Sequence, residues 1–177
     1  MLGSLVPLSA LNNASPLEYV GGTVLAAAAA SITVPVLPSY TVLVVECEIV
    51  KDATGNSIYL TLNGDGGANY DRQRVLANST TISGARTTGA TSITLAQAAL
   101  RASTHGLITL IIVKSTTGTD AQVLTSASHE DTTPVLMLEL QGAEWNNTSA
   151  AITSLSITAT SGNLAADTTI AVYGLRG

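Results

Sequence analysis

The residues most able to do chemistry are the oxygen-bearing side chains around Asn-Gly-Asp-Gly-Gly at 63–67. Carboxylate and amide oxygens at alternating positions can bind Ca²⁺, but calcium loops close with a bidentate Glu, and no Glu follows here. We therefore expect a structural turn whose glycines adopt positive φ. The turn residues are Asn63, Gly64, Asp65, Gly66 and Gly67. A cation is the alternative, and it would be held by Asn63, Asp65, Asn69 and Asp71.

Two carboxylates, Glu46 and Glu48, are two residues apart in an apolar run, so on a strand they face the same side. Paired carboxylates can hydrolyse glycosidic bonds. A sugar platform of aromatic rings would be needed, and only 3% of the residues are aromatic, with no Phe. We expect a polar stripe on the solvent or subunit face and no enzymatic activity. A hydrolase of cell-surface polymers stays as a hypothesis that a depolymerase assay would test.

The remaining reactive side chains are few. His105 and His129 are not spaced as metal ligands, and a zinc site needs three or four ligands. Cys47 is the single cysteine, so it cannot form an intramolecular disulfide, and the flanking carboxylates do not favour a thiolate. No phosphate-binding loop, dinucleotide fingerprint or Gly-x-Ser-x-Gly elbow is present. We expect no metal and no cofactor.

Composition points to an apolar, all-β protein. The 177 residues carry 7 Lys and Arg against 12 Asp and Glu, a net charge of −5, which argues against nucleic-acid binding. The longest apolar stretch, 24–30, is far too short to span a bilayer. A hydrophobic share of 46% argues against disorder. With so few aromatic residues, we expect Trp145, Tyr70 and Tyr173 to anchor the core.

Short apolar or alternating runs, separated by Gly, Asn, Asp, Ser or Pro, predict about ten strands and no long helix. The runs are 31–36, 41–50, 57–62, 69–76, 80–83, 92–95, 106–113, 121–127, 134–140, 152–158 and 168–173. Residues 96–102 could form one or two helical turns. The pattern favours an antiparallel two-sheet β-sandwich of the jelly-roll type over residues 26–177.

Residues 1–25 have a different character. Prolines and the Gly21-Gly22 pair interrupt any long element, so we expect an extended N-terminal arm. Its leucines and valine are too apolar for a tail in water, and we expect the arm to dock on its own domain or on a neighbour. The assembly residues of this arm are Leu2, Leu5, Val6, Leu8, Leu11 and Leu17.

Several short motifs occur in a fixed order. They are Leu-Thr-Leu-Asn-Gly-Asp-Gly-Gly-Ala-Asn-Tyr at 60–70, Trp145 followed by Ala-Ile at 151–152, Gly-Asn at 162–163 and Tyr-Gly at 173–174. In this order they resemble a family of tailed-bacteriophage virion structural proteins over residues 30–177. Leu164 stands where an aromatic residue is common, and the arm is unusually apolar.

The resemblance implies a β-sandwich on the virion exterior, without enzymatic activity. We expect a capsid decoration or cement protein that forms a homotrimer on the head and contacts the major capsid protein. The alternative is a tail-fibre or baseplate module that contacts tail proteins and recognises a glycan or protein receptor on the host surface. For that alternative, the Thr-, Ser- and Asn-rich loops expected at 77–92 and 114–120 would carry the binding site.

Overall fold

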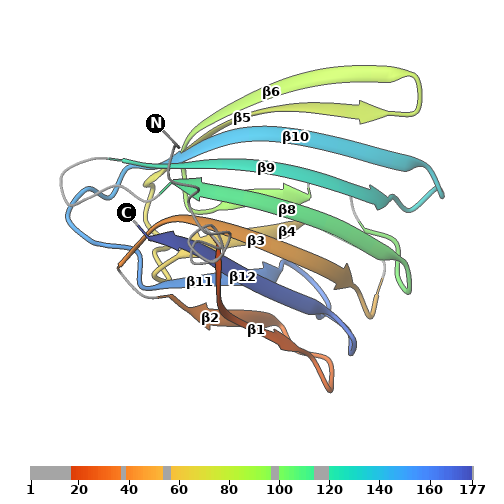
Figure 1. The fold of residues 1–177 in the computed structure, drawn as a ribbon. Coiled ribbons are helices and arrows are strands. Elements are labelled where there is room, and N and C mark those ends of the chain that lie inside the picture. The colour runs from red at the N-terminus through yellow and green to blue at the C-terminus, as the bar shows by residue number, and fades with distance from the viewer. Residues whose placement is uncertain (1–16, 37–38, 54–56, 97–99, 114–119, 177) are drawn as a thin grey trace, which may run out of the picture.

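A computed structural model describes residues 17–36, 39–53, 57–96, 100–113 and 120–176 (Figure 1). The described residues form twelve β-strands and no helix, so none of them lies in a helix that could span a membrane. The strands are β1 (Glu18–Val24), β2 (Ser31–Pro35), β3 (Tyr40–Val50), β4 (Ile58–Leu62), β5 (Tyr70–Asn78), β6 (Thr81–Ala90), β7 (Ile93–Ala96), β8 (His105–Val113), β9 (Ala121–Glu130), β10 (Leu136–Trp145), β11 (Ser154–Ala159) and β12 (Thr169–Arg176).

The strands form two antiparallel sheets. The larger sheet has the order β1-β12-β3-β8-β9-β10-β5-β6, and the smaller has the order β2-β11-β4-β7. The pairing is nested, because β1 pairs with β12, β2 with β11, β3 with β8, and β4 with β7. A long hairpin folded over itself in this way is a jelly roll. The expected antiparallel two-sheet β-sandwich of jelly-roll type is confirmed.

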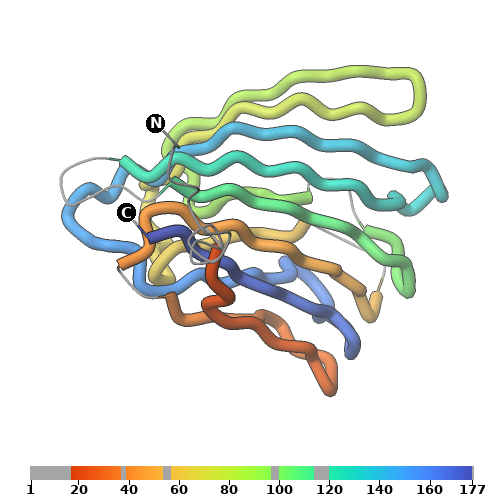
Figure 2. The backbone as a smooth tube through the Cα atoms, viewed as in Figure 1, coloured from red at the N-terminus to blue at the C-terminus, as the bar shows by residue number. Residues whose placement is uncertain are grey.

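Two hairpins are inserted into this eight-stranded framework. The β5–β6 hairpin lies between β4 and β7 in the chain, and the β9–β10 hairpin lies between β8 and β11. Both join the same end of the larger sheet, where β10 pairs with β5. Figure 2 shows the two hairpins running side by side. The larger sheet therefore extends beyond the smaller sheet that covers its other half.

The core lies between the two sheets and follows the alternation of the strands. In β3, Leu43, Val45, Cys47 and Ile49 are buried, while Glu46 and Glu48 between them are exposed. Because side chains alternate across a strand, apolar residues at every second position put one face of each sheet into the core. The same alternation buries Ile108, Leu110 and Ile112 of β8, and Leu155 and Ile157 of β11.

The N-terminal boundary differs from our expectation. Residues 18–24, which we assigned to an extended arm ending at residue 25, form β1 at the edge of the larger sheet. The Gly21-Gly22 pair does not break this strand. Gly22 approaches β12 so closely that a Cβ there would lie 2.4 Å from the carbonyl oxygen of Ile170, so the position requires glycine. The arm residues Leu2, Leu5, Val6, Leu8 and Leu11 lie outside the described residues.

The strands also differ in number and length from those expected. The segment 77–92, in which we expected loops around a short strand at 80–83, contains the ten-residue strand β6 and the end of β5. Of the expected helical turn at 96–102, Ala96 ends β7 and residues 100–102 are not helical, while 97–99 lie outside the described residues. The expected loop at 114–120 also falls almost entirely outside them.

Candidate functional site

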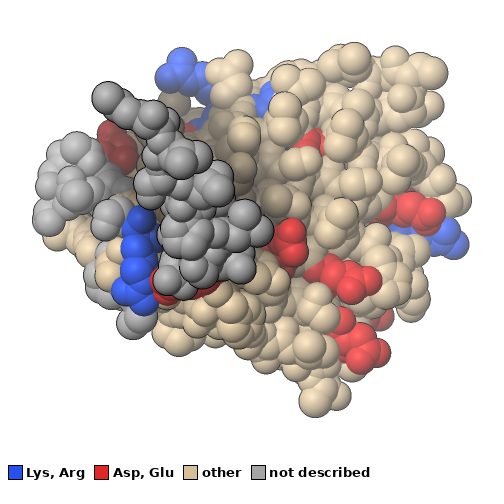
Figure 3. All heavy atoms as spheres, in the orientation of Figure 1, with Lys and Arg blue, Asp and Glu red and all other residues tan. Residues whose placement is uncertain are grey.

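The outer face of the larger sheet, which points away from the smaller sheet, carries a cluster of exposed apolar side chains. The described residues expose twelve large apolar side chains, and nine of these lie on β8, β9, β10, β5 and β6, each at least 40% exposed. We call these nine residues the apolar face: Val75, Ile82, Leu107, Ile111, Val113, Leu124, Leu136, Leu138 and Leu140. Figure 3 looks on to this side and shows few charged side chains there. Large exposed apolar patches mark interaction sites.

Strand register brings the apolar face residues into contact distance across the strands. Leu140 of β10 pairs with Val75 of β5. Leu138 pairs with Ala77, which in turn pairs with Ile82 of β6. Side chains directly opposite each other in an antiparallel pair have Cβ atoms about 4.5–5.5 Å apart. These residues therefore form one continuous band across three strands.

A second band lies on β8 and β9, where Ile111 pairs with Leu124. Between the two bands run Ser126 and Ser128 of β9, which pair with Leu140 and Leu138 on one side. These serines are small and uncharged, so they separate the bands without placing a charge on the surface. Together the two bands make a broad, nearly neutral surface.

The middle of strand β10, residues 138–141, has its polarity reversed relative to an ordinary sandwich strand, while Ala143 and Trp145 nearer its end are buried in the ordinary way. Leu138 and Leu140 point outward and are 54% and 52% exposed, whereas Glu139 and Gln141 are each 3% exposed and point inward. A one-residue shift of register would exchange the two sets of side chains. The observed register instead leaves leucines in contact with solvent and removes a carboxylate from it.

Polar partners on the inner side stabilise this register. Arg74 of β5 donates to Glu139, with 3.5 Å between Nη1 and Oε2, and His129 Nε2 lies 3.9 Å from Glu139 Oε1. The Gln141 side chain donates a hydrogen bond of 2.8 Å to the carbonyl oxygen of Thr94 on β7. Buried polar groups are tolerated when they are hydrogen-bonded. The inserted hairpins are therefore held against β7 by polar contacts as well as apolar packing.

A shallow polar hollow of about 250 Å³ adjoins the apolar face. Gly142 is among its lining residues, and an added Cβ there would meet no atom within 4 Å. The hollow is lined by Asp71, Arg72, Gln73, Arg86, Gln122, Gly142, Ala143 and Glu144. Within it, Gln122 donates a hydrogen bond of 3.1 Å to Glu144. The side chains offer both donors and acceptors, as a hydroxylated ligand would require.

The turn at 63–67 is built around the Asp65 carboxylate. Oδ2 accepts hydrogen bonds from Trp145 Nε1 at 2.8 Å, Asn69 Nδ2 at 2.9 Å and Asn147 Nδ2 at 3.4 Å, while Oδ1 accepts one from the Gly67 amide at 2.8 Å. Burial opposes ionisation of Asp65, but these hydrogen bonds outweigh it and hold the pKa of the carboxyl below its usual value. The carboxylate is thus engaged by four N–H donors.

The other residues of the alternative cation site point elsewhere. Asn63 accepts hydrogen bonds from the backbone amides of Thr153 and Ser154 and donates to the carbonyl of Ala151. Asp71 accepts a hydrogen bond of 2.7 Å from the Gly89 amide. The structure therefore brings Asp65 and Asn69 together but turns Asn63 and Asp71 to other partners. Asn63 and Gly64 have positive φ, at 54° and 65°, as a tight turn requires, whereas Gly66 and Gly67 do not, so the expected positive φ is found at one of the three turn glycines.

The expected core anchors lie in two places. Trp145 and Tyr70 are 1% and 0% exposed. Burial raises the pKa of Tyr70 to about 12, against the lowering effect of the hydrogen bond that its oxygen accepts from the Leu62 amide. Tyr173 instead is half-buried on the outer face of the larger sheet, where its ring packs edge-on against Tyr19 at a centroid distance of 5.9 Å.

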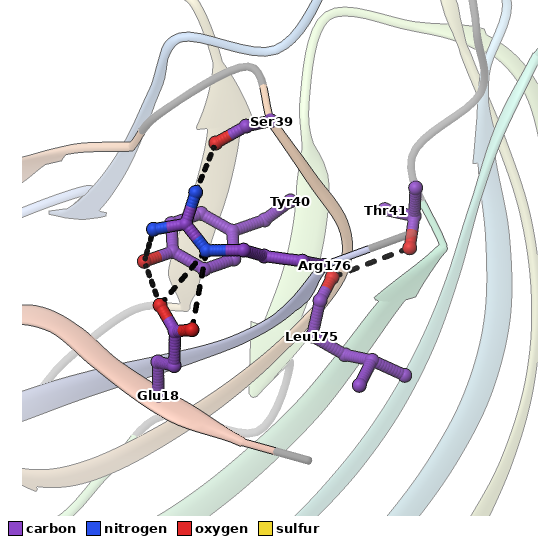
Figure 4. A network of polar contacts seen from close by, with 6 residues as sticks. All are labelled: Glu18, Ser39, Tyr40, Thr41, Leu175 and Arg176. Atoms are coloured by element: carbon purple, nitrogen blue, oxygen red, sulfur yellow. Dashed lines mark hydrogen bonds and ion pairs between the residues drawn. The ribbon is translucent and has the colours of Figure 1, made fainter. Parts of the chain in front are cut away.

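A polar network fixes the corner where the described chain begins (Figure 4). Glu18 of β1 accepts hydrogen bonds from Tyr40 Oη at 2.9 Å and from Arg176 Nε at 3.0 Å. The Arg176 guanidinium also lies 4.8 Å from the centre of the Tyr40 ring. The hydrogen bond from Tyr40, followed by that from Arg176, holds the pKa of Glu18 below its usual value. The network ties β1 to β3 and β12, beside the exposed Leu17.

The other candidate residues are dispersed. Glu46 and Glu48 lie exposed on the outer face of β3, and Glu48 contacts His105 at 2.7 Å. His129 is buried near Glu139. Cys47 is fully buried, and desolvation, assisted by the charge of Glu46, raises the pKa of its thiol to about 12. The described residues contain no group of three or more His, Cys, Asp and Glu side chains that could hold a metal ion.

The Gly-Asn motif at 162–163 lies in the β11–β12 loop and binds the loop after β3. Asp52 accepts hydrogen bonds from the Asn163 amide at 2.8 Å and from Asn163 Nδ2 at 2.9 Å. Buried Lys51 donates a hydrogen bond of 3.0 Å to the Ser161 carbonyl. The motif therefore links the β11–β12 loop to the loop after β3 by hydrogen bonds.

Sequence reasoning did not single out the apolar face. The available signal was the run Leu-Met-Leu-Glu-Leu-Gln at 136–141, in which the more polar alternate positions would ordinarily face solvent. Comparison with known proteins returned no matching family model, no matching curated protein and no matching solved structure.

Proposed function

We propose that this protein is a structural component of a bacteriophage virion, a decoration or cement protein on the outside of the head. The observation that carries the proposal is strand β10, which exposes Leu138 and Leu140 while it buries Glu139 and Gln141. Such a register becomes favourable when another surface covers the leucines, because apolar burial stabilises by about 25 cal/mol per Å². The apolar face is then a surface for assembly.

The jelly-roll fold supports the same proposal, since this architecture recurs in viral capsid proteins, although fold alone does not fix function. The order of the sequence motifs gives the resemblance to virion proteins. The low charged fraction of 11% suits a protein that buries surface against neighbours. Its partners in this role are further copies of itself and the major capsid protein, and the role requires no catalysis, cofactor, nucleic acid or membrane.

Cryo-electron microscopy of the source virion tests the location. Density for this chain on the head, with the apolar face against neighbouring subunits, is the expected result. Density confined to the tail would contradict the head assignment and favour receptor binding. Density on neither head nor tail would contradict a role in the virion.

A binding assay tests the surface. The double variant Leu138→Gln/Leu140→Gln should lose attachment to decoration-free heads, while its thermal stability stays close to that of the natural chain. Val24→Gln is the matched control, because Val24 is similarly exposed at 62% but lies outside the apolar face. Undiminished attachment of the double variant would contradict the proposal.

A second candidate function is recognition of a host-surface glycan, and the polar hollow at Gly142 favours it. Side chains with both donors and acceptors surround open space there. Gly142→Phe would fill the hollow and should abolish binding on an array of bacterial polysaccharides. A natural chain that binds no glycan on that array would remove this candidate.

A further inference from the structure

The edges of the two sheets are protected to very different degrees. The larger sheet ends in β1 and β6, and the smaller ends in β2 and β7. An edge strand presents unpaired backbone N–H and C=O groups that can pair with another chain. Proteins block this with short strands, prolines, bulges, charges or covering segments.

Three of these edges carry such a device. Strand β7 has four residues, all buried. Strand β2 has five residues and ends at Pro35, which lacks a backbone N–H. Strand β1 has a register shift between Tyr19 and Gly21, and the charged Glu18 sits at its start. None of the three offers a long regular edge.

Strand β6 is the longest of the four edge strands, with ten residues, and its register shift lies at one end and leaves a long regular run. Residues 81–87 of β6 pair one to one with residues 78–72 of β5, so this run contains no bulge. The register shift falls at the far end of the strand, near Gly89 with its φ of 62°. Residues 81–86 are all exposed, contain no proline and include one charged residue, Arg86. Figure 1 shows β6 along the outer border of the larger sheet.

We propose that β6 pairs antiparallel with β6 of a second copy of this chain, about a two-fold axis, and so joins the two larger sheets. This two-chain species takes the place of the homotrimer that the family resemblance led us to expect. A two-fold axis lets identical strands satisfy each other's free backbone groups. Charge favours this edge for self-contact. Each copy has a net charge of −5, whereas β6 carries one arginine and no acidic residue, so repulsion between copies is small there.

The side chains of β6 fit a pairing centred on Gly84. In that register Gly84 faces its own counterpart, and Ile82 faces Arg86 of the second copy. The two arginines are thereby kept apart, and the aliphatic part of each can cover Ile82, the most exposed residue of the apolar face at 74%. Because Ile82 pairs with Ala77 beside Leu138, the joined sheets would carry one apolar face across both copies.

Sedimentation velocity on the purified full chain tests this pairing without any virion, so its outcome is independent of the proposed function. The natural chain should sediment as a two-chain species at micromolar concentration. Gly84→Lys places two lysines opposite each other at the axis and should halve the mass. Gly142→Lys is the matched control and should stay a two-chain species, because it adds the same charge on the same face, at an open position away from the edge.

Hydrogen exchange on the natural chain gives a second measurement that needs no variant. Alternate amides of residues 81–87 should exchange slowly in the two-chain species and more than about tenfold faster after dilution to single chains. A monomer or a trimer at all concentrations would overturn the proposal, since a trimer leaves one β6 edge without a mate. Dissociation by Gly142→Lys with no effect of Gly84→Lys would also overturn it, by placing the contact on the apolar face.

Discussion

Arg74 and Glu139 meet across β5 and β10 on the buried side of the larger sheet, with 3.5 Å between Arg74 Nη1 and Glu139 Oε2. Arg74 pairs in register with Gln141, so Glu139 is its diagonal neighbour. Their side chains are 15% and 4% exposed. The ion pair is one of the contacts that hold Glu139 on the inward face of β10, and Leu138 and Leu140 on either side of Glu139 therefore point outward.

Removal of the arginine should destabilise the protein strongly. Arg74→Met leaves the Glu139 carboxylate buried beside fewer donors, and we expect a loss of about 3–5 kcal/mol in the free energy of unfolding. Arg86→Met, the same change at an exposed position on the adjacent strand, should cost less than about 0.5 kcal/mol. The double variant Arg74→Met/Glu139→Leu should recover most of the loss. Urea denaturation of the four proteins measures these differences, and equal effects at positions 74 and 86 would show that the pair does not set the register.

Gly174 is required by the packing of Tyr40. A Cβ at position 174 would lie 2.3 Å from Cδ1 of the Tyr40 ring, so Gly174→Ala should destabilise the fold by about 1–3 kcal/mol through overpacking. Gly142→Ala is the control on another strand glycine, since a Cβ there meets nothing within 4 Å. It should be neutral or stabilising by up to about 1 kcal/mol, because glycine is costly in a strand. Melting temperatures distinguish the two, and an equal loss for both would contradict this account.

Asp65 should make stability depend on pH in the acid range. Its hydrogen bonds lower the folded-state pKa below the unfolded value of about 3.9. The stabilisation is therefore fully present above pH ~4 and is lost as the pH falls through the folded pKa. Asp65→Asn should cost about 1–3 kcal/mol at neutral pH and flatten this acid dependence. Asp120→Asn, at an exposed position, is the control and should leave the stability of the protein close to that of the natural chain. Denaturation curves between neutral and acid pH test both variants, and equal effects of the two would contradict this role of Asp65.

Cys47 should react only when the protein opens. The thiol is fully buried and its pKa is raised to about 12, so labelling with a disulfide reagent at pH 8 should be slower than for a free thiol by more than about a thousand-fold. A Cys47→Ser/Ser126→Cys variant supplies the control, since Ser126 is exposed on β9. That variant should label rapidly. Fast labelling of the natural chain in native buffer would contradict the burial of Cys47.

The strands that could be predicted are those whose alternate positions differ clearly in polarity. In β3, the buried Val45, Cys47 and Ile49 alternate with the exposed Glu46 and Glu48, so local pattern and tertiary burial agree. The turn at 63–67 was also predictable, because its glycines and Asn63 tolerate positive φ. Its partners were not, since Trp145 is eighty residues away from Asp65 in the chain.

The parts that could not be predicted depend on contacts between distant strands. In β10 the inward set combines the apolar Met137, Ala143 and Trp145 with Glu139 and Gln141. Burial of the two polar residues depends on Arg74 and Thr94, which lie on other strands. In β1, the glycine pair is a signal for a chain break, whereas the structure uses Gly22 for close approach to β12. The type of a residue shows which conformations and environments it tolerates. Contacts with distant strands decide which of these it adopts.

The nested strand pairing has a consequence for how the chain folds. Tyr19 pairs with Tyr173 and Ile32 with Ile157, so the outermost pairs close the longest loops, and the contact order is high. Folding of such topologies is slow, in the range of milliseconds to seconds. During synthesis β1 leaves the ribosome long before β12 exists, so the backbone groups of β1 that pair with β12 stay unpaired until β12 emerges. The hydrogen bonds from Arg176 to Glu18, which join residues 158 positions apart in the chain, therefore form only after β12 has been synthesised.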